Sequence, residues 1–324
     1  MDALIDLFAN TQAALYESVA QPVAFAMGLG SRLEDVFDAT GWLLIGLLQI
    51  AVMLAVIGPL QRWRPVEPVT DKRAVVTDVI YTLIHRLGVF RCVLFFTIDP
   101  WMDELLGEMR TAGFGTFHLE DLWPGVTDGP WTSFLIYLVV FDFLNYWLHR
   151  AQHQFHPWWA LHAVHHSQRQ MTQWTDNRNH VLDDLLHALI WVMVAQVIGI
   201  APSQFVAVVA LTQLSESFQH ANLRVSFGWL GERLWVSPRF HRTHHGVGIG
   251  HETHGAHTLG GHNFGVLLPW WDMLFGTADF GPRFVPTGIR DQVEEGRDYG
   301  QGFWAQQRLG LQRFFSAWGG SSGV

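Results

Sequence analysis

Residues 131–153, WTSFLIYLVVFDFLNYWLHRAQH, join a long apolar run directly to a pair of histidines. The apolar run, residues 131–148, carries one acid, Asp142, and approaches the roughly 20 residues that a membrane-spanning helix needs. His149 and His153 follow four residues apart, so they share one face if the helix continues. The stretch therefore predicts a membrane helix that ends in two candidate metal ligands.

Two further clusters repeat this spacing. HAVHH supplies His162, His165 and His166, and HRTHH supplies His241, His244 and His245. Imidazole nitrogen suits zinc, copper, iron and nickel, and two ions with four to six ligands each would need roughly eight to twelve donors. One pair of histidines four residues apart is weak evidence, because such a pair is often only solvated or packed. Three clusters with eight donors together predict a dinuclear metal site.

The composition indicates a membrane protein. Charged residues make up 15% of the chain, against roughly 25% in soluble domains, and aromatic residues make up 14%. The net charge is −9 and Lys72 is the single lysine, so the chain has no basic stripe for nucleic acid. The only cysteine, Cys92, lies in an apolar stretch, where we expect a buried and unreactive thiol.

Four apolar stretches are candidates for crossing the membrane: residues 42–60, 75–99, 131–148 and 185–218. The second contains His85, Arg86 and Arg91, which are costly at membrane depth, so we expect it to be broken or re-entrant. The last is interrupted at Gly199 and Pro202, which predicts two short helices in a hairpin.

Positive charge predicts the orientation. Four basic residues cluster after the first span, whereas the loop at residues 99–129 is mostly acidic, so the first loop is expected to be cytoplasmic. These basic residues are Arg62, Arg64, Lys72 and Arg73. The hairpin then returns His220 to the side on which His149 emerges, so all three clusters lie on the cytoplasmic face, of the inner membrane if the source is bacterial.

The predicted fold class is all-α. We expect a polytopic membrane protein with about four to five transmembrane helices and a cytoplasmic, histidine-rich helical cap that holds the dinuclear site. We expect N-terminal membrane helices and loops in residues 1–130, a catalytic domain in residues 131–280, and a tail in residues 281–324. Apolar spacing in residues 2–20 predicts a further helix. The aromatic stripe in residues 303–318 indicates a helix that lies in the membrane interface or docks on the protein.

Two known kinds of metal enzyme fit poorly. Helical metalloproteases carry a glutamate directly after the first histidine of the pair as general base, but Arg150 stands there. Carboxylate-bridged di-iron bundles use Glu-x-x-His motifs, and none occurs among these clusters. An all-nitrogen site is left.

The region that contains the histidine clusters resembles a known family, the membrane fatty acid hydroxylase and sterol desaturase superfamily. The resemblance covers roughly residues 131–280 and lies in four ordered blocks. These are YWLHRAQHQFHPWWALHAVHHS at 146–167, FQHANL around His220, SPRFHRTHH at 237–245 and NFGVLLPWWDMLFGT at 263–277.

The resemblance implies two non-haem iron ions that activate dioxygen to hydroxylate or desaturate a lipid such as a fatty acyl chain or a sterol-like molecule. Hydroxylation is the expectation ahead of desaturation. Side chains alone cannot attack an alkane carbon, so a metal or cofactor must carry this chemistry. The implied ligands are His149, His153, His162, His165, His166, His180, His220, His241, His244 and His245.

Three polar residues are candidates to stand behind the ligands, where a carboxylate or carbonyl often accepts the second ring N–H. Asp142 precedes His149 by seven residues on the same helical face, and Asn263 and Asp272 belong to the last block. His187 is expected to be a packed core residue. The glycine-rich stretch with His251, His254, His257 and His262 is expected to be a solvated loop or a substrate gate.

Electrons must come from a separate donor protein, because the sequence has no dinucleotide-binding glycine fingerprint and no fused haem module. A docking patch could comprise Arg224, Arg233, Arg239 and Arg242, although the cytoplasmic excess of positive charge also explains them. A histidine-rich metal carrier or transporter is the rival hypothesis. Such a protein should place ligands along a path within its spans, whereas these clusters flank the spans at one end.

Overall fold

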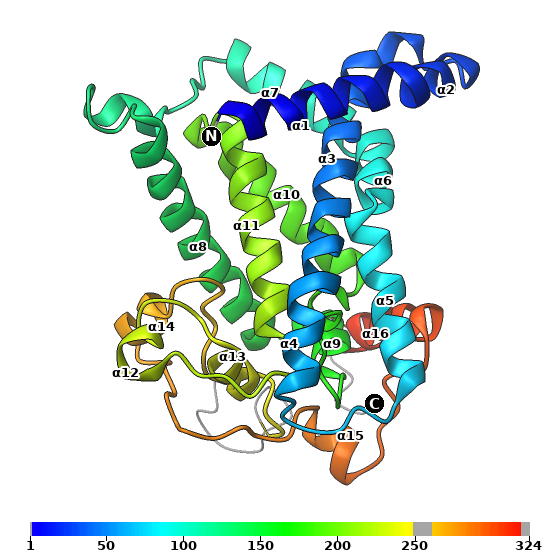
Figure 1. Cartoon of the computed structure of the whole chain (residues 1–324), viewed down its shortest axis with the longest axis vertical. Helices are drawn as coiled ribbons and strands as arrows, with labels where there is room; N and C mark the ends of the chain where they lie inside the picture. The colour runs from blue at the N-terminus through cyan, green and yellow to red at the C-terminus, as the bar shows by residue number, and fades with distance from the viewer. Residues whose placement is uncertain (1, 249–260, 319–324) are drawn as a thin grey trace. The chain divides into compact units, whose positions relative to one another are not determined.

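The computed structural model describes residues 2–248 and 261–318, and its regular structure is helical (Figure 1). Within those ranges no strand forms, and one isolated bridge joins Gly246 to Thr287. The chain divides into two compact units. The first comprises Met1–Val52 and Leu83–Ala112, and the second comprises Met53–Thr82 and Gly113–Val324.

The first unit contains the N-terminal helices and the charged part of the second apolar stretch. Its helices are α1 (Asp2–Leu15), a π-helical turn (Tyr16–Ala20), α2 (Gln21–Ala26), a 3-10 turn (Gly30–Arg32), α3 (Leu33–Val52), α6 (Val89–Thr97) and α7 (Asp99–Thr111). The helix predicted in residues 2–20 is therefore confirmed.

The predicted break in residues 75–99 lies at Gly88, whose backbone is left-handed with φ 78°, between α5 (Lys72–Arg86) and α6. The charges within this stretch have partners. Arg86 is buried and donates to Gln49 at 3.1 Å, and Arg91 stacks over the ring of Trp42. The prediction of a buried Cys92 was wrong, because the thiol is exposed on α6. An apolar stretch alone does not show which face of its helix packs against protein.

The second unit holds the histidine motifs. After a π-helical turn (Met53–Ile57) its longer helices are α4 (Gly58–Trp63), α5, α8 (Pro130–Gln154), α9 (His156–His166), α10 (Val181–Ile198), α11 (Pro202–Gln219), α13 (Pro238–His244) and α16 (Phe303–Trp318). Short turns of helix are Leu119–Leu122, Thr175–Asn177, α12 (Gly228–Gly231), α14 (Trp270–Leu274) and α15 (Arg290–Glu294).

Three helical segments of the described chain are long and apolar enough to cross a membrane: Gly30–Trp63, Pro130–Gln154 and Val181–Ile198. They contain or overlap three of the predicted spans. The predicted hairpin in residues 185–218 is formed by α10 and α11, which separate at Gly199, a left-handed residue with φ 64°, and at Pro202 in the first turn of α11. The count of four to five spans stays a prediction.

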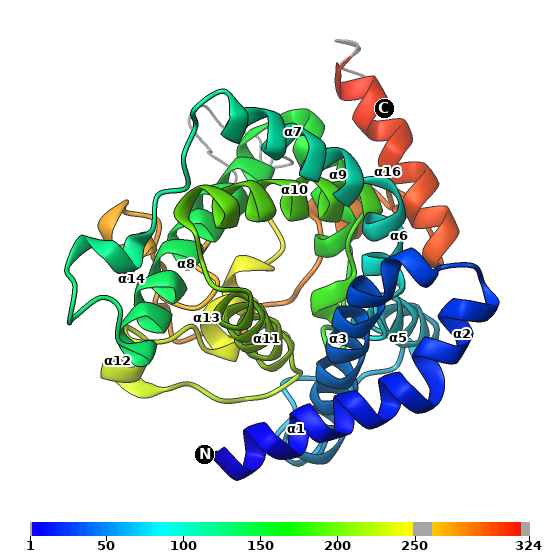
Figure 2. The same ribbon diagram turned by 90° about the horizontal axis from the view of Figure 1, so that it is seen from above.

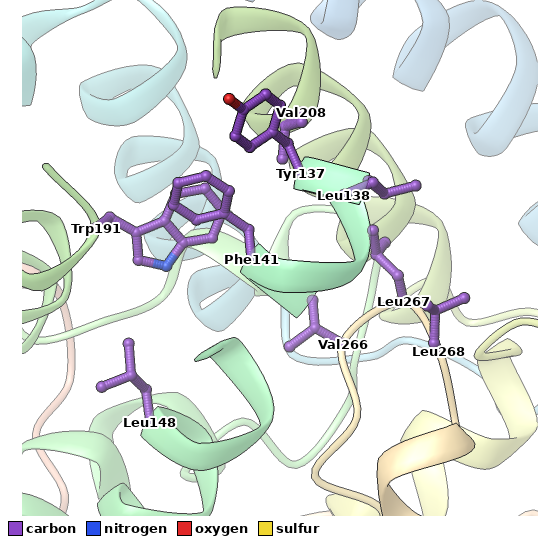
Figure 3. Close-up of a cluster of buried hydrophobic side chains, with 9 residues drawn as sticks. All are labelled: Tyr137, Leu138, Phe141, Leu148, Trp191, Val208, Val266, Leu267 and Leu268. Carbon is purple, nitrogen blue, oxygen red and sulfur yellow. The ribbon is translucent and has the colours of Figure 1, made fainter. Parts of the chain in front are cut away.

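The apolar core of the second unit lies where α8, α10 and α11 pack together (Figure 3). Phe141 of α8 is fully buried, and its ring centroid lies 4.5 Å from that of Trp191 on α10. Val208 adds the contribution of α11. Figure 2 shows α11 end on and α16 lengthwise, so α16 lies across the direction of α11. The end of α8, the start of α10 and the end of α11 carry polar residues of the histidine site.

Candidate metal centre

Nine of the ten predicted ligands meet in two buried groups. In each group one possible ligand atom per residue lies within 4.8 Å of all the others. The first group is His149, His153, His162, His166 and His244, and the second is His165, His220, His241 and His245. The groups adjoin, because the rings of His166 and His245 are stacked with centroids 4.3 Å apart.

Helix phase decides which histidine joins which group. His162 and His166 of α9 are four residues apart and face one way, whereas His165 is turned away by about 100° from His166 and joins the other group. The third motif divides likewise, with His244 in the first group and His241 in the second. Each motif of the HxxHH type thus serves both groups, which would place two ions side by side.

Local sequence sets the helix ends that carry the ligands. α8 continues six residues beyond the predicted span to include His149 and His153, and α9 restarts at once with Pro157 in its first turn. The Ser237 hydroxyl accepts from the Phe240 N–H at 3.1 Å, which caps the short helix α13 ahead of its histidines.

The outer ring nitrogens are oriented by the protein. Nδ1 of His149 donates to the Phe264 carbonyl at 2.9 Å, Nδ1 of His244 to the His262 carbonyl at 2.7 Å, and Nδ1 of His220 to the Glu216 carbonyl at 2.8 Å. Because a carbonyl only accepts, each Nδ1 carries the proton and each Nε2 offers a lone pair to the centre.

The inner nitrogens fit a metal cation. Nε2 of His149 and Nε2 of His162 are buried and have no hydrogen-bond partner within the described parts of the chain. Nε2 of His244, which holds a lone pair, lies 3.1 Å from Nε2 of His166, and Nε2 of His241 lies 2.9 Å from Nε2 of His220. A bound cation would satisfy lone pairs that are otherwise buried at a cost.

Burial keeps the ligands neutral. The pKa values of four ligands, His165, His166, His241 and His245, lie well below the usual value, mainly because the rings are buried away from water and secondly because other rings are near. Burial lowers the pKa of His244 to about 3. Neutral imidazole is the form that binds a metal ion.

These lowered pKa values predict acid sensitivity of the metal-free protein. Between about pH 6.5 and the lower folded-state pKa values, the unfolded chain binds protons that the folded chain does not. Stability should therefore be independent of these histidines above about pH 6.5. Below it, stability should fall by up to about 1.4 kcal/mol per pH unit for each such histidine. Thermal unfolding in detergent from pH 8 to 5 measures this, and an unchanged melting temperature down to pH 5 contradicts it.

Asp183 was not predicted, yet it contacts a ligand directly. Its carboxylate accepts from Nδ1 of His162 at 3.2 Å, from Gln152 at 2.8 Å and from the Trp158 indole at 2.6 Å. The feature of the sequence that could have pointed to Asp183 is an acidic residue in the first turn of an apolar helix. Whether Asp183 or Asp184 faces inward depends on how α10 packs against α9, and sequence spacing does not contain that information.

The side chains of the three polar residues that were predicted to accept from ligand N–H groups form no hydrogen bond to the described ligands. They hold the backbone near those ligands instead. Asp142 accepts from Leu267 N, Leu268 N and the Trp271 indole, and none of its hydrogen bonds goes to a described histidine. Asp272 accepts from Phe264 N at 2.8 Å and from Gly265 N at 2.7 Å. Both acids therefore fix the segment whose carbonyls orient the rings.

Asn263 occupies the centre of that segment. It is the only described non-glycine residue with a positive φ, 58°, and its side chain donates to the carbonyls of Phe240 and Asp279. The carbonyls that hold His244 and His149 belong to its two neighbours, His262 and Phe264. The left-handed backbone at Asn263 thus turns the carbonyls on either side of it toward two different ligands.

His180 lies outside both groups, which differs from the expectation that it completes the ligand shell. Its Nε2 bonds the Gln307 carbonyl of α16 at 2.8 Å, and its Nδ1 accepts from Leu182 N at 3.1 Å. With both nitrogens engaged, the ring joins α16 to the start of α10. His262 is exposed, and His251, His254 and His257 lie outside the described residues.

The family model described as fatty acid hydroxylase matches residues 134–277. Ornithine lipid hydroxylase OlsE of Rhizobium tropici is 27% identical over 247 residues, which cover 75% of this chain and 70% of that protein. Alkylglycerol monooxygenase of Homo sapiens is 31% identical over 166 residues, 51% of this chain and 35% of that protein.

A third relative is the Delta(7)-sterol-C5(6)-desaturase of Nicotiana tabacum, 28% identical over 183 residues, which cover 52% of this chain and 55% of that protein. No solved structure was found to match the chain. These relatives are a lipid hydroxylase, a monooxygenase and a desaturase, and residues 134–277 contain all nine histidines of the two groups. By sequence, residues 134–277 thus match the fatty acid hydroxylase family, and the chain is similar to enzymes that oxidise lipids.

Proposed function

We propose that the protein is a membrane-bound di-iron oxidoreductase that uses dioxygen to hydroxylate a lipid. The observation that carries the proposal is the meeting of nine buried histidines, from distant segments, in two adjoining all-nitrogen groups. Such donor sets suit iron, zinc, copper and nickel. The choice of iron, and of oxidative lipid chemistry, is supported by the family match and by the names of the similar enzymes.

The protein's own residues would hold, orient and shield the ions. His149, His153, His162, His166 and His244 would bind one ion, and His165, His220, His241 and His245 the other. When bound, the iron pair would supply the redox chemistry with dioxygen that side chains lack. The carbonyls of Phe264 and His262 and the carboxylate of Asp183 would fix the ring tautomers.

The packing of the first basic loop supports a cytoplasmic position for the site. Arg62, Arg64, Lys72 and Arg73 are all exposed. Their loop binds the histidine-bearing cap: the Arg64 carbonyl accepts from Arg224 N at 2.7 Å, and Glu67 pairs with Arg242 at 2.6 Å. Excess positive charge marks cytoplasmic loops, so the cap would lie on that side. We retain residues 131–280 as the proposed catalytic domain.

Hydroxylation needs an external two-electron donor, because R–H, O₂, two electrons and two protons give R–OH and water. A separate redox protein would supply the electrons. Ion pairs with Glu232 and Glu67 occupy Arg239 and Arg242, so the exposed Arg224 would be the most accessible part of a docking patch. A hydroxylated lipid product supports this proposal over the carrier hypothesis, since a carrier has no reason to oxidise lipid.

The test uses purified protein loaded with iron(II), a chemical reductant, oxygen and a total lipid extract. We expect oxygen uptake that depends on lipid and lipid products heavier by one oxygen atom in mass spectra. Loss of two hydrogens would instead assign a desaturase. Protein loaded with redox-inactive zinc is the matched control. Iron-loaded protein that consumes no oxygen with any lipid, while binding two ions, would favour the carrier.

A further inference from the structure

Asn145, His187 and Trp191 form a polar cluster between α8 and α10, here called the polar triad. The Asn145 amide oxygen lies 3.1 Å from Nε2 of His187 and 2.8 Å from the indole nitrogen of Trp191. Both helices belong to the long apolar segments Pro130–Gln154 and Val181–Ile198. An ionisable side chain inside such a segment usually has a function, because placing it there is costly.

Donor and acceptor chemistry fixes the state of His187. An indole N–H only donates, so the Asn145 atom that faces it is the oxygen. That oxygen also faces Nε2 of His187, so Nε2 carries the proton and, in the neutral ring, Nδ1 holds a lone pair. Within the described parts of the chain Nδ1 has no hydrogen-bond partner, and the ring is half-buried. The triad therefore presents one unused acceptor.

The triad lies one helical turn from the histidine site. Asn145 precedes His149 by four residues on α8, and His187 follows Asp183 by four residues on α10. On its other side, Trp191 packs against Phe141 in the apolar core (Figure 3). The triad thus lies between the ligands and the apolar interior, about 6 Å along the helices from the ligand layer.

We propose that the polar triad is a substrate subsite in which Nδ1 of His187 accepts a hydrogen bond from an amide N–H or a hydroxyl of the lipid. The inference rests on the proposed function and narrows its substrate class. A distance of about 6 Å corresponds to roughly four covalent bonds of about 1.5 Å, so the oxidised carbon should lie within that reach of the donor. Polar contacts between membrane helices account for Asn145 and Trp191 but leave no use for the second nitrogen.

Binding of two matched lipids to zinc-loaded protein tests the subsite without turnover. N-methylhexadecanamide has an amide N–H, and methyl hexadecanoate has an ester oxygen in its place. Wild-type protein should bind the amide roughly tenfold more tightly, because the ester leaves the acceptor unpaired. His187→Leu should abolish this preference. His187→Gln should keep much of it, since its amide can donate to Asn145 and accept from the lipid.

Met193→Leu is the matched control, since Met193 is 47% exposed on the same helix. It should keep the wild-type ratio. If His187→Leu loses zinc, His187→Phe preserves the ring volume and takes its place. Equal binding of the two lipids by wild-type protein overturns the proposal, as does a preference that persists when His187 is replaced by either apolar residue.

Oxygen uptake by iron-loaded wild-type protein separates the two proposals. No uptake with either lipid counts against the proposed function but does not alter the binding ratio. Uptake with both lipids at equal affinity counts against the subsite alone. Fragmentation of the oxidised amide provides a second check, and oxygen located beyond about four bonds from the nitrogen contradicts the subsite geometry.

Discussion

His166→Ala and His241→Ala should each lower iron affinity and lipid oxidation by at least about 100-fold. His166 belongs to the group of five histidines and His241 to the group of four. Each substitution therefore removes one nitrogen donor from a different group. Changing a residue that merely orients a ligand typically costs 10- to 100-fold in metal affinity, so removing a ligand should cost at least as much as the upper value. Iron per chain, measured by elemental analysis after dialysis, should fall from about two.

Two other histidines provide matched controls for these variants. The His262 side chain is exposed, and alanine there keeps the carbonyl that accepts from His244. His180→Ala disrupts a junction with α16 but removes no member of either group. Both should retain about two irons per chain. Full iron content in His166→Ala and His241→Ala, or equal losses in all four variants, would contradict the assignment of ligands.

The positions of the histidines were predictable because helix geometry is local. Residues three or four apart must share a face, so His149 with His153 and His162 with His166 could be paired without a fold. The partition between groups could not be predicted in the same way. It depends on the way α9, α11 and α13 pack, and the end of α11 places His220 beside His165, 55 residues away in the sequence.

Asp142 illustrates the limit of periodicity. Seven residues bring it back to the face of His149, but they also separate the two by about 10.5 Å along the helix, too far for a hydrogen bond. The carboxylate instead binds backbone more than 120 residues later, at Leu267 and Leu268. His180 differs for a similar reason, since its partner is the carbonyl of Gln307. Apolar runs, by contrast, predicted the long helices well because length and composition alone determine them.

Asp183→Asn should lower metal affinity by about 10- to 100-fold without removing a ligand. The carboxylate accepts from Gln152 and Trp158 on one oxygen and from Nδ1 of His162 on the other. Asparagine has one amide oxygen, which the first two donors would claim, so its NH₂ group would face the N–H of His162. Two donors cannot bond, and His162 would move its proton to Nε2 and lose the lone pair that faces the centre.

Asp184→Asn is the control for this variant, because it removes the same charge from the same helical turn. If orientation of His162 is the cause, Asp183→Asn should lose metal affinity and Asp184→Asn should retain it, with similar melting temperatures for both metal-free proteins. Competition with a chelator measures the affinity directly. Equal losses in the two variants would mean that negative charge near the centre, rather than the tautomer of one imidazole, holds the metal. Asp183→Glu should recover part of the affinity, since it restores a group that only accepts.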